Sequence, residues 1–220
     1  MKKSRTSPPS HLLWDWNGTL LDDVAASFNA INSLLADHGM PLVTRADYLA
    51  HFGFPVRDYY LHLGFPQNLS QSQWQSLAHD YHQHFNAGPQ APFPDARAGL
   101  ERCRDAGLPQ SVLSALYQPM LTEALDAHGF SPFFTRIRGA ADLNGGSKLD
   151  SGRLLLADLA LPPGDLLLIG DTLHDAHVAR ELGIPCILVS RGHCNPARLA
   201  TANVPVFPSV THALDYVLAT

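Results

Sequence analysis

The sequence predicts an α/β fold, in which a Rossmann-like parallel sheet forms the core and a helical cap domain is inserted into it. Short apolar runs, the clearest at 165–169, alternate with helical segments, which is typical of a parallel sheet covered on both faces. An all-helical block interrupts this alternation after one strand and indicates an insertion. We expect the core at 11–22 and 92–220, and the cap at 23–91.

The core elements follow one another as strand and helix. Three predicted helices end at Gly107, Gly129 and Gly183, because glycine readily closes a helix. The predicted strands are 11–16, 111–114, 134–138, 165–169, 185–189 and 204–207. The predicted helices are 96–106, 118–128, 151–160, 173–182 and 210–218.

The inserted block has the spacing of amphipathic helices. Its first helix, 22–38, carries Phe28, Ile31 and Leu35 on one face. Three further helices are expected at 44–51, 55–63 and 70–86, the last with Ser70 as its N-cap. Residues 1–10, which are rich in serine and proline, are expected to form a flexible tail.

Composition excludes several classes of protein. A net charge of -5 without long basic runs argues against a nucleic-acid or acidic-membrane binder, and no segment has the roughly 18 apolar residues of a membrane span. Cys103, Cys186 and Cys194 form no CxxC pair, which favours a reducing, cytoplasmic location. Neither composition nor motifs distinguish a monomer from a homodimer.

Polar residues stand where the predicted strands end. Asp15 ends the first strand, Ser114 the second and Asp171 the fourth, while Lys148 opens the helix after the third. Asp175 follows Asp171 by one helical turn. Because ligands bind beyond the carboxyl ends of parallel strands, these five residues are expected to converge there.

Together these residue types suit phosphoryl transfer. A carboxylate such as Asp15 can attack phosphorus, and Mg²⁺ prefers hard oxygen ligands of the kind that Asp15 and Asp171 supply. Lys148 can neutralise charge, and the Ser114 hydroxyl with nearby backbone N–H groups can hold phosphoryl oxygens. Gly18 lets the backbone approach the phosphate closely. Lys148 is also the only lysine other than Lys2 and Lys3 in the tail.

Four segments carry a resemblance to a known family. Asp15-Trp-Asn-Gly-Thr-Leu20, Ser114, Lys148 and Gly170-Asp171-Thr172-Leu-His-Asp175 resemble, in order, the four motifs of the haloacid dehalogenase superfamily. The helical insertion after the first motif looks like the phosphoglycolate-phosphatase-like branch. Gly53-Phe54-Pro55-Val-Arg57 resembles the turn of that branch's cap which faces the substrate.

The resemblance implies roles for individual residues of a magnesium-dependent phosphatase acting on a small phosphorylated metabolite, with phosphoglycolate as the family-level expectation. Asp15 would be the nucleophile, and the metal would be held by Asp15, the Asn17 backbone oxygen and Asp171, with Asp175 orienting the site. Contacts to the substrate would come from Gly18, Thr19, Ser114, Ala115 and Lys148. Arg57 suits either a substrate carboxylate or a surface salt bridge.

Asn17 departs from the family pattern, which has aspartate there as the general acid and base. An amide cannot carry a proton, and such catalysis contributes roughly 10²–10⁴-fold. Hydrolysis could be slow, or a cap histidine or a metal-bound water could replace the acid. The alternative is a weakly active phospho-ligand binding or regulatory protein. If the missing acid limits the reaction, Asn17→Asp raises turnover.

Several histidines invite a second metal site. His79 and His82 share a helical face, but His84 points away from both, so a solvated helix is the preferred interpretation. His174 could lie near the mouth of the site, although an ordinary exposed position on its helix is favoured.

Overall fold

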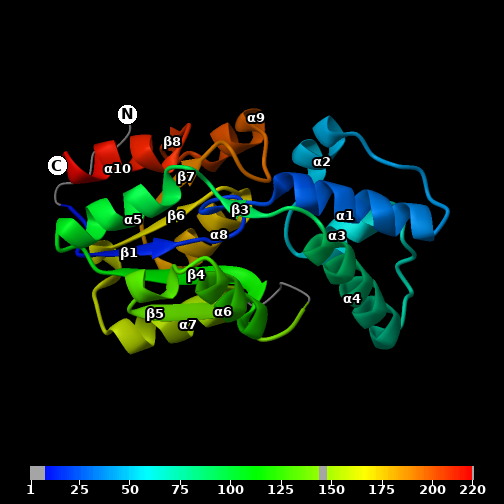
Figure 1. The fold of residues 1–220 in the computed structure, drawn as a ribbon, viewed down its shortest axis with the longest axis horizontal. Helices are drawn as coiled ribbons and strands as arrows, with labels where there is room; N and C mark the ends of the chain where they lie inside the picture. Colours follow the sequence, from blue (N-terminus) through cyan, green and yellow to red (C-terminus); the bar gives the residue numbers. More distant parts are fainter. Residues whose placement is uncertain (1–7, 144–147, 220) are drawn as a thin grey trace.

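The core is a six-stranded parallel sheet (Figure 1). The computed structural model describes residues 8–143 and 148–219, so most of the tail expected at 1–10 lies outside the described residues. In spatial order the strands are β5 (Arg136–Ala140), β4 (Gln110–Tyr117), β1 (His11–Trp14), β6 (Leu166–Gly170), β7 (Cys186–Val189) and β8 (Val206–Phe207).

Helices cover both faces of this sheet. On β1, Leu12 and Trp14 join the hydrophobic cluster of one face and Leu13 that of the other, as alternation along a strand requires. One face carries α5 (Ala96–Asp105), α6 (Gln118–Ala127) and α10 (Val210–Leu218); the other carries α7 (Lys148–Leu159), α8 (Leu173–Leu182) and α9 (Pro196–Leu199). This arrangement confirms the predicted α/β class.

Four helices form a unit beside the sheet, and we call them the cap: α1 (Val24–Asp37), α2 (Arg45–His51), α3 (Val56–His62) and α4 (Gln71–Ala87). They enclose a hydrophobic cluster of their own. A two-stranded antiparallel ribbon, β2 (Leu21–Asp22) with β3 (Ala91–Pro92), joins them to the core. Figure 1 places the cap at the end of the sheet toward which β1 and β4 run.

Hydrogen bonds tie the cap to the core at a second place, away from the ribbon. The Asn195 N–H donates to the Leu49 carbonyl at 3.1 Å. The Arg198 guanidinium donates to the carbonyls of Leu49 and Phe52, at 3.3 and 2.8 Å. All the acceptors are backbone groups at the end of α2, so this contact depends on the position of the helix rather than on its side chains.

Among the element boundaries that differ from the sequence expectation, three lie next to predicted site residues. The first strand ends at Trp14, so Asp15 lies beyond it. Strand β4 continues past Ser114 to Tyr117, and its pairing with β5 shifts register after Leu113, which places Ser114 in an irregular stretch. Helix α7 begins at Lys148 rather than at residue 151. Among the described residues, no helix is long and apolar enough to cross a bilayer.

Arg191 joins three segments near the ribbon. Its guanidinium donates to an Asp95 carboxylate oxygen at 2.5 Å and to the Thr19 carbonyl at 3.0 Å, and it lies 3.8 Å from the centre of the Phe93 ring. Asp95 also accepts from the N–H and hydroxyl of Thr211. Burial works to raise the pKa of Asp95, but the bonds from Arg191 and Thr211 outweigh it and hold that pKa below its ordinary value.

We therefore expect Asp95→Asn to lower the free energy of unfolding by about 1 kcal/mol above about pH 5. A carboxylate with a lowered pKa stabilises the fold while it is ionised, so the difference between the two proteins should shrink as the pH falls through the folded-state pKa. Urea titrations across this range measure it. Asp215→Asn, which removes an exposed partner of Arg102, is the control and should change little. A pH-independent loss in Asp95→Asn would contradict the prediction.

Candidate active site

The structure brings the predicted charged residues together at the carboxyl ends of the strands. Asp15 follows β1 and Asp171 follows β6, while Lys148 begins α7 and Asp175 lies in the first turn of α8. Each is at most 6 % exposed. Three segments far apart in the chain thus supply one buried, charged cluster.

Lys148 bridges two of the carboxylates. Its Nζ lies 2.5 Å from Asp15 Oδ1 and 2.5 Å from Asp175 Oδ1. The other oxygen of Asp175 accepts from the Thr172 N–H at 2.9 Å and the Thr172 hydroxyl at 2.7 Å, in the capping box of α8. Because both Asp175 oxygens are engaged, this residue is placed to orient Lys148 and the first turn of α8.

One carboxylate oxygen of Asp15 and one of Asp171 face the same threonine hydroxyl. The Thr19 hydroxyl lies 3.3 Å from Asp15 Oδ2 and 3.2 Å from Asp171 Oδ1, although a single hydroxyl hydrogen can serve only one of them at a time. Oxygens of Asp15, Asp171 and Asp175 all lie within 4.8 Å of one another. This cluster therefore has more acceptors than donors.

The pKa values of these residues reflect the excess of carboxylates over cations in the cluster. Burial raises the pKa of Asp15 to about 6 in spite of the opposing charge of Lys148. Burial likewise raises the pKa of Asp171 well above its ordinary value, against the opposing charge of His193. Burial works to lower the pKa of Lys148, but the charges of Asp15 and Asp175 outweigh it and raise that pKa. Three buried carboxylates around one ammonium fit a divalent cation, which prefers such hard oxygen ligands.

Two glycines let the backbone approach Asp171. Gly18 has a φ of +71°, and a Cβ there would lie 2.3 Å from Asp171 Oδ2. A Cβ on Gly192 would lie 1.9 Å from the same oxygen. Both distances are below any real contact, so only glycine fits on either side of this carboxylate. The space around Asp171 is thus shaped by backbone as well as by side chains.

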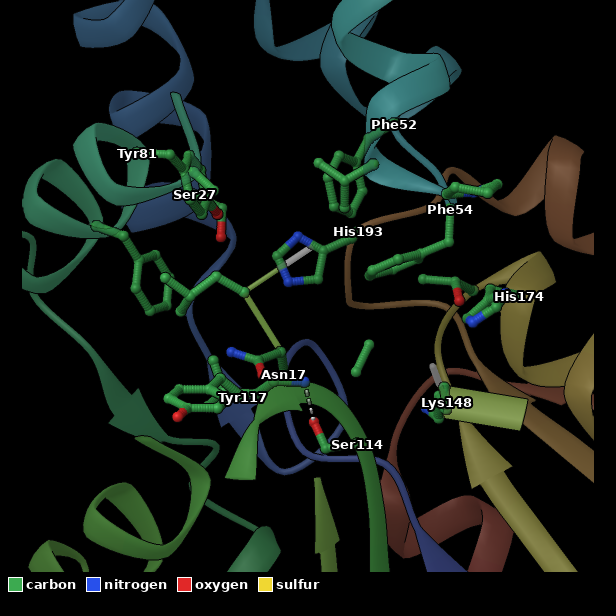
Figure 2. Close-up of a pocket in the computed structure, with 18 of the residues that line it drawn as sticks. Asn17, Ser27, Phe52, Phe54, Tyr81, Ser114, Tyr117, Lys148, His174 and His193 are labelled. Atoms are coloured by element: carbon green, nitrogen blue, oxygen red, sulfur yellow. Dashed lines mark hydrogen bonds between the residues drawn. The ribbon is translucent and has the colours of Figure 1, made fainter. Parts of the chain in front are cut away.

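A cavity of about 350 Å³ opens from this cluster toward the cap. Ser114, Ala115, Lys148 and Asn17 line its core side, as Figure 2 shows for the three of them that it labels. The Ser114 oxygen accepts from the Leu116 N–H at 3.1 Å, which orients the hydroxyl and leaves its hydrogen free to donate. Ser114 and Ala115 therefore offer a place for phosphoryl oxygens.

Two residues predicted to contact substrate lie outside the lining of this cavity. The Gly18 N–H is engaged by Asp23 at 2.8 Å and by the Leu21 carbonyl at 2.9 Å, and the Thr19 hydroxyl faces the carboxylates. Both residues therefore hold the first motif in place through these contacts and do not line the cavity. Arg57 lines the cap end of the cavity, with its guanidinium 4.8 Å from the centre of the Trp74 ring.

A buried group of residues that the sequence reasoning missed lies beside Asn17. The Asn17 amide donates to Asp23 Oδ2 at 2.8 Å, and His193 Nε2 lies 3.1 Å from Asp23 Oδ1. His193 Nδ1 is 2.8 Å from the Tyr48 hydroxyl, which belongs to the cap, and its backbone N–H donates to Asp171 at 2.6 Å. Figure 2 shows His193 in the middle of the cavity wall.

The charges of this group are matched. Burial works to lower the pKa of His193, but the neighbouring charge of Asp23 outweighs it and raises that pKa to about 9. Burial works to raise the pKa of Asp23, but the charge of His193 and the hydrogen bonds from His193, Asn17 and Gly18 hold it below its ordinary value. At neutral pH the pair is therefore ionic.

The sequence held a faint signal for both members of this pair. Asp23 follows the first motif by three residues and stands at the start of α1, yet its side chain makes no capping bond to that helix. His193 follows β7 by four residues, on the same edge of the sheet as the other polar residues.

The remaining histidines do not form a second metal cluster among the described residues. His79 lies within hydrogen-bonding distance of Gln83, and His84 pairs with Asp37. His174 lines the cavity and stacks on Phe54 at 4.8 Å. Burial lowers the pKa of His174 to about 4.

Comparison with known proteins identifies the family. Residues 12–189 match the haloacid dehalogenase-like hydrolases. The phosphoglycolate phosphatase of Caulobacter vibrioides is 32% identical over 191 residues, covering 83% of this chain and 79% of that protein. The tyrosine-protein kinase PtkA of Mycobacterium tuberculosis is 27% identical over 210 residues, covering 93% of this chain and 69% of that protein. Relatives with this degree of likeness thus carry different names.

Solved structures share the fold. A predicted phosphatase from Clostridium acetobutylicum aligns with a TM-score of 0.84 at 20% identity, covering 97% of this chain and all of that one. The alignment spans sheet and cap alike. With the family match over most of the sequence and the buried carboxylate cluster in place, the chain belongs to the haloacid dehalogenase-like hydrolases and, within them, to the phosphatases of the phosphoglycolate-phosphatase-like branch.

Proposed function

We propose that this protein is a magnesium-dependent phosphomonoesterase that hydrolyses a small phosphorylated metabolite in the cytoplasm through an aspartyl phosphate on Asp15. The observation that carries the proposal is the convergence of Asp15, Lys148 and Asp171 where the cavity meets the core. In this proposal 11–22 and 92–220 form the catalytic core, and 23–91 is the cap that encloses the substrate.

Asp15 and Asp171 would hold the magnesium ion, with the backbone oxygen of Asn17, and Asp175 would keep the site oriented. Asp15 Oδ2 and Asp171 Oδ1, which face the same Thr19 hydroxyl, support this assignment. When bound, the ion supplies positive charge that stabilises the phosphoryl group during transfer.

In the first step a carboxylate oxygen of Asp15 attacks phosphorus, the ester P–O bond breaks, and an acyl phosphate forms as the alkoxide departs and takes a proton from water. Lys148, already 2.5 Å from Asp15, offsets the negative charge of the nucleophile and of the phosphoryl oxygens. The hydroxyl of Ser114 donates to one of those oxygens. In the second step water cleaves the acyl phosphate and releases inorganic phosphate.

The departing alcohol needs a proton, and Asn17 cannot supply one. This gap favours a second candidate, a phospho-ligand binding protein with little turnover. The amide of Asn17 is held by Asp23, so it has a role in the buried pair even where it has none in proton transfer. The relatives named phosphoglycolate phosphatase support hydrolysis as the first candidate.

The test is phosphate release from p-nitrophenyl phosphate and phosphoglycolate with Mg²⁺ and with EDTA. We expect release that depends on Mg²⁺, and an acid-quenched enzyme that carries the mass of one phosphoryl group on the peptide containing Asp15. Saturable binding of these esters without any release would favour the second candidate. Turnover that EDTA leaves unchanged would contradict the proposed role of the metal.

A further inference from the structure

The cavity has two chemically different halves. Its core side carries the charged groups Asp15, Lys148 and Asp171. Its cap side is lined mainly by apolar and aromatic side chains from α1, α4 and the loop before α3, with Ser27, Arg57, Gln71 and His82 as the polar members. The apolar and aromatic side chains include Ile31, Phe52, Phe54, Trp74, Tyr81 and Phe85. Figure 2 shows Phe52, Phe54 and Tyr81 reaching in from the cap, opposite Ser114 and Lys148.

Few cations in this cavity are available to a second anionic group. Lys148 is bonded to Asp15 and Asp175, and His193 is paired with Asp23. Burial lowers the pKa values of His174 and His82, so both rings are neutral at pH 7. Among the described lining residues the guanidinium of Arg57 remains, but this residue is exposed and its guanidinium lies over the Trp74 ring.

The position of the phosphate decides what enters the apolar half. With phosphorus beside Asp15 and the phosphoryl oxygens at Ser114 and Lys148, the rest of the ester extends toward the cap. There a carboxylate would lose its hydration without gaining a buried cationic partner, which is costly. A hydrocarbon group would bury its surface favourably against the aromatic side chains.

We infer that the alcohol portion of the substrate is an uncharged aromatic or bulky apolar group, and that small carboxylated esters such as phosphoglycolate are poor substrates. The inference rests on the proposed phosphatase function and names the substrate class of that same site. A cavity of about 350 Å³ holds a phosphate with one ring or a branched chain of similar size.

The first experiment compares benzyl phosphate, ethyl phosphate and phosphoglycolate, which are all esters of primary alcohols. In the presence of Mg²⁺ we expect kcat/KM for benzyl phosphate to exceed that for each of the others by at least about tenfold. The same three esters are titrated into the Asp15→Asn variant by calorimetry, and benzyl phosphate should again bind most tightly.

The two measurements separate the failures. Absence of turnover with the binding preference intact would sink the phosphatase proposal and support the inferred ligand class. Turnover in which phosphoglycolate equals or exceeds benzyl phosphate, with the same order in binding, would overturn the inference and leave the phosphatase standing.

A matched pair of cap variants tests whether the aromatic wall is responsible. Phe85 lines the cavity and Phe65 lies in the cap interior away from it, and both are 5 % exposed. Phe85→Leu should lower kcat/KM for benzyl phosphate by about tenfold and leave that for ethyl phosphate nearly unchanged. Phe65→Leu should leave the ratio of the two unchanged. If the ratio of kcat/KM for benzyl phosphate to that for ethyl phosphate were the same in both variants, the aromatic side chains of the cavity would not be responsible for the preference.

Discussion

Asp15→Asn is expected to lower phosphate release by about 10⁴-fold or more, because a neutral amide cannot attack phosphorus. The substitution keeps the shape of the side chain, and its amide oxygen can still accept a hydrogen bond from Lys148. Steady-state release from benzyl phosphate and p-nitrophenyl phosphate measures the loss. Asp105→Asn, which alters an exposed carboxylate on α5, is the control and should retain wild-type turnover.

The same variant has a predictable effect on stability. Because burial raises the pKa of Asp15 to about 6, its ionised form is unfavourable in the metal-free fold; the penalty develops as the pH rises from about 4 to about 6 and is complete above that value. The amide mimics the protonated acid. Metal-free Asp15→Asn should therefore unfold at the same or a higher temperature than the wild type at pH 8, and should gain less from added Mg²⁺. If Asp15→Asn lost its activity because it unfolds, its unfolding temperature would lie below that of the wild type.

Restoring an acid at position 17 is expected to need two substitutions rather than one. The Asn17 amide lies 2.8 Å from Asp23 Oδ2, so Asn17→Asp would place two carboxylates against each other in a buried site. Two carboxylates at that distance cannot both ionise, and one would hold a proton with a strongly raised pKa. If only the missing acid mattered, Asn17→Asp alone would give the full gain in turnover. Because the carboxylate of Asp23 lies beside position 17, this single variant should give less than the full gain.

We expect Asn17→Asp combined with Asp23→Ser to raise turnover of benzyl phosphate by about 10²-fold over the wild type, the lower end of what general acid–base catalysis contributes. The four proteins of this double-mutant cycle are compared by kcat with saturating Mg²⁺. Asp23→Ser alone removes the partner of His193 and should not increase turnover. If Asn17→Asp alone is as fast as the double variant, the two side chains are not coupled as the structure indicates.

Much of the core could be predicted because its signals are local. The apolar run of β6 and the glycine that ends α8 fix these elements without reference to the rest of the chain. The charged cluster was equally accessible, since Asp15 and Asp171 follow strands whose carboxyl ends meet at one edge of the sheet. For these residues the rule for parallel sheets and the family motifs led to the same positions.

The pair of Asp23 and His193 could not be predicted from local signals. These residues are separated by 170 positions, and neither belongs to a motif that suggests the other. Their contact depends on how α1 of the cap leaves the ribbon and on the loop after β7. The irregular end of β4 could not be predicted for a similar reason, because a register shift depends on pairing with a neighbouring strand rather than on composition.

The contacts of α2 with Asn195 and Arg198 give the cap a preferred direction of opening. The ribbon of β2 and β3 is continuous with the chain and cannot separate, whereas the hydrogen bonds to Leu49 and Phe52 can break. Opening of the cap about the ribbon would therefore require the bonds to Leu49 and Phe52 to break, together with the contact between the Tyr48 hydroxyl and His193.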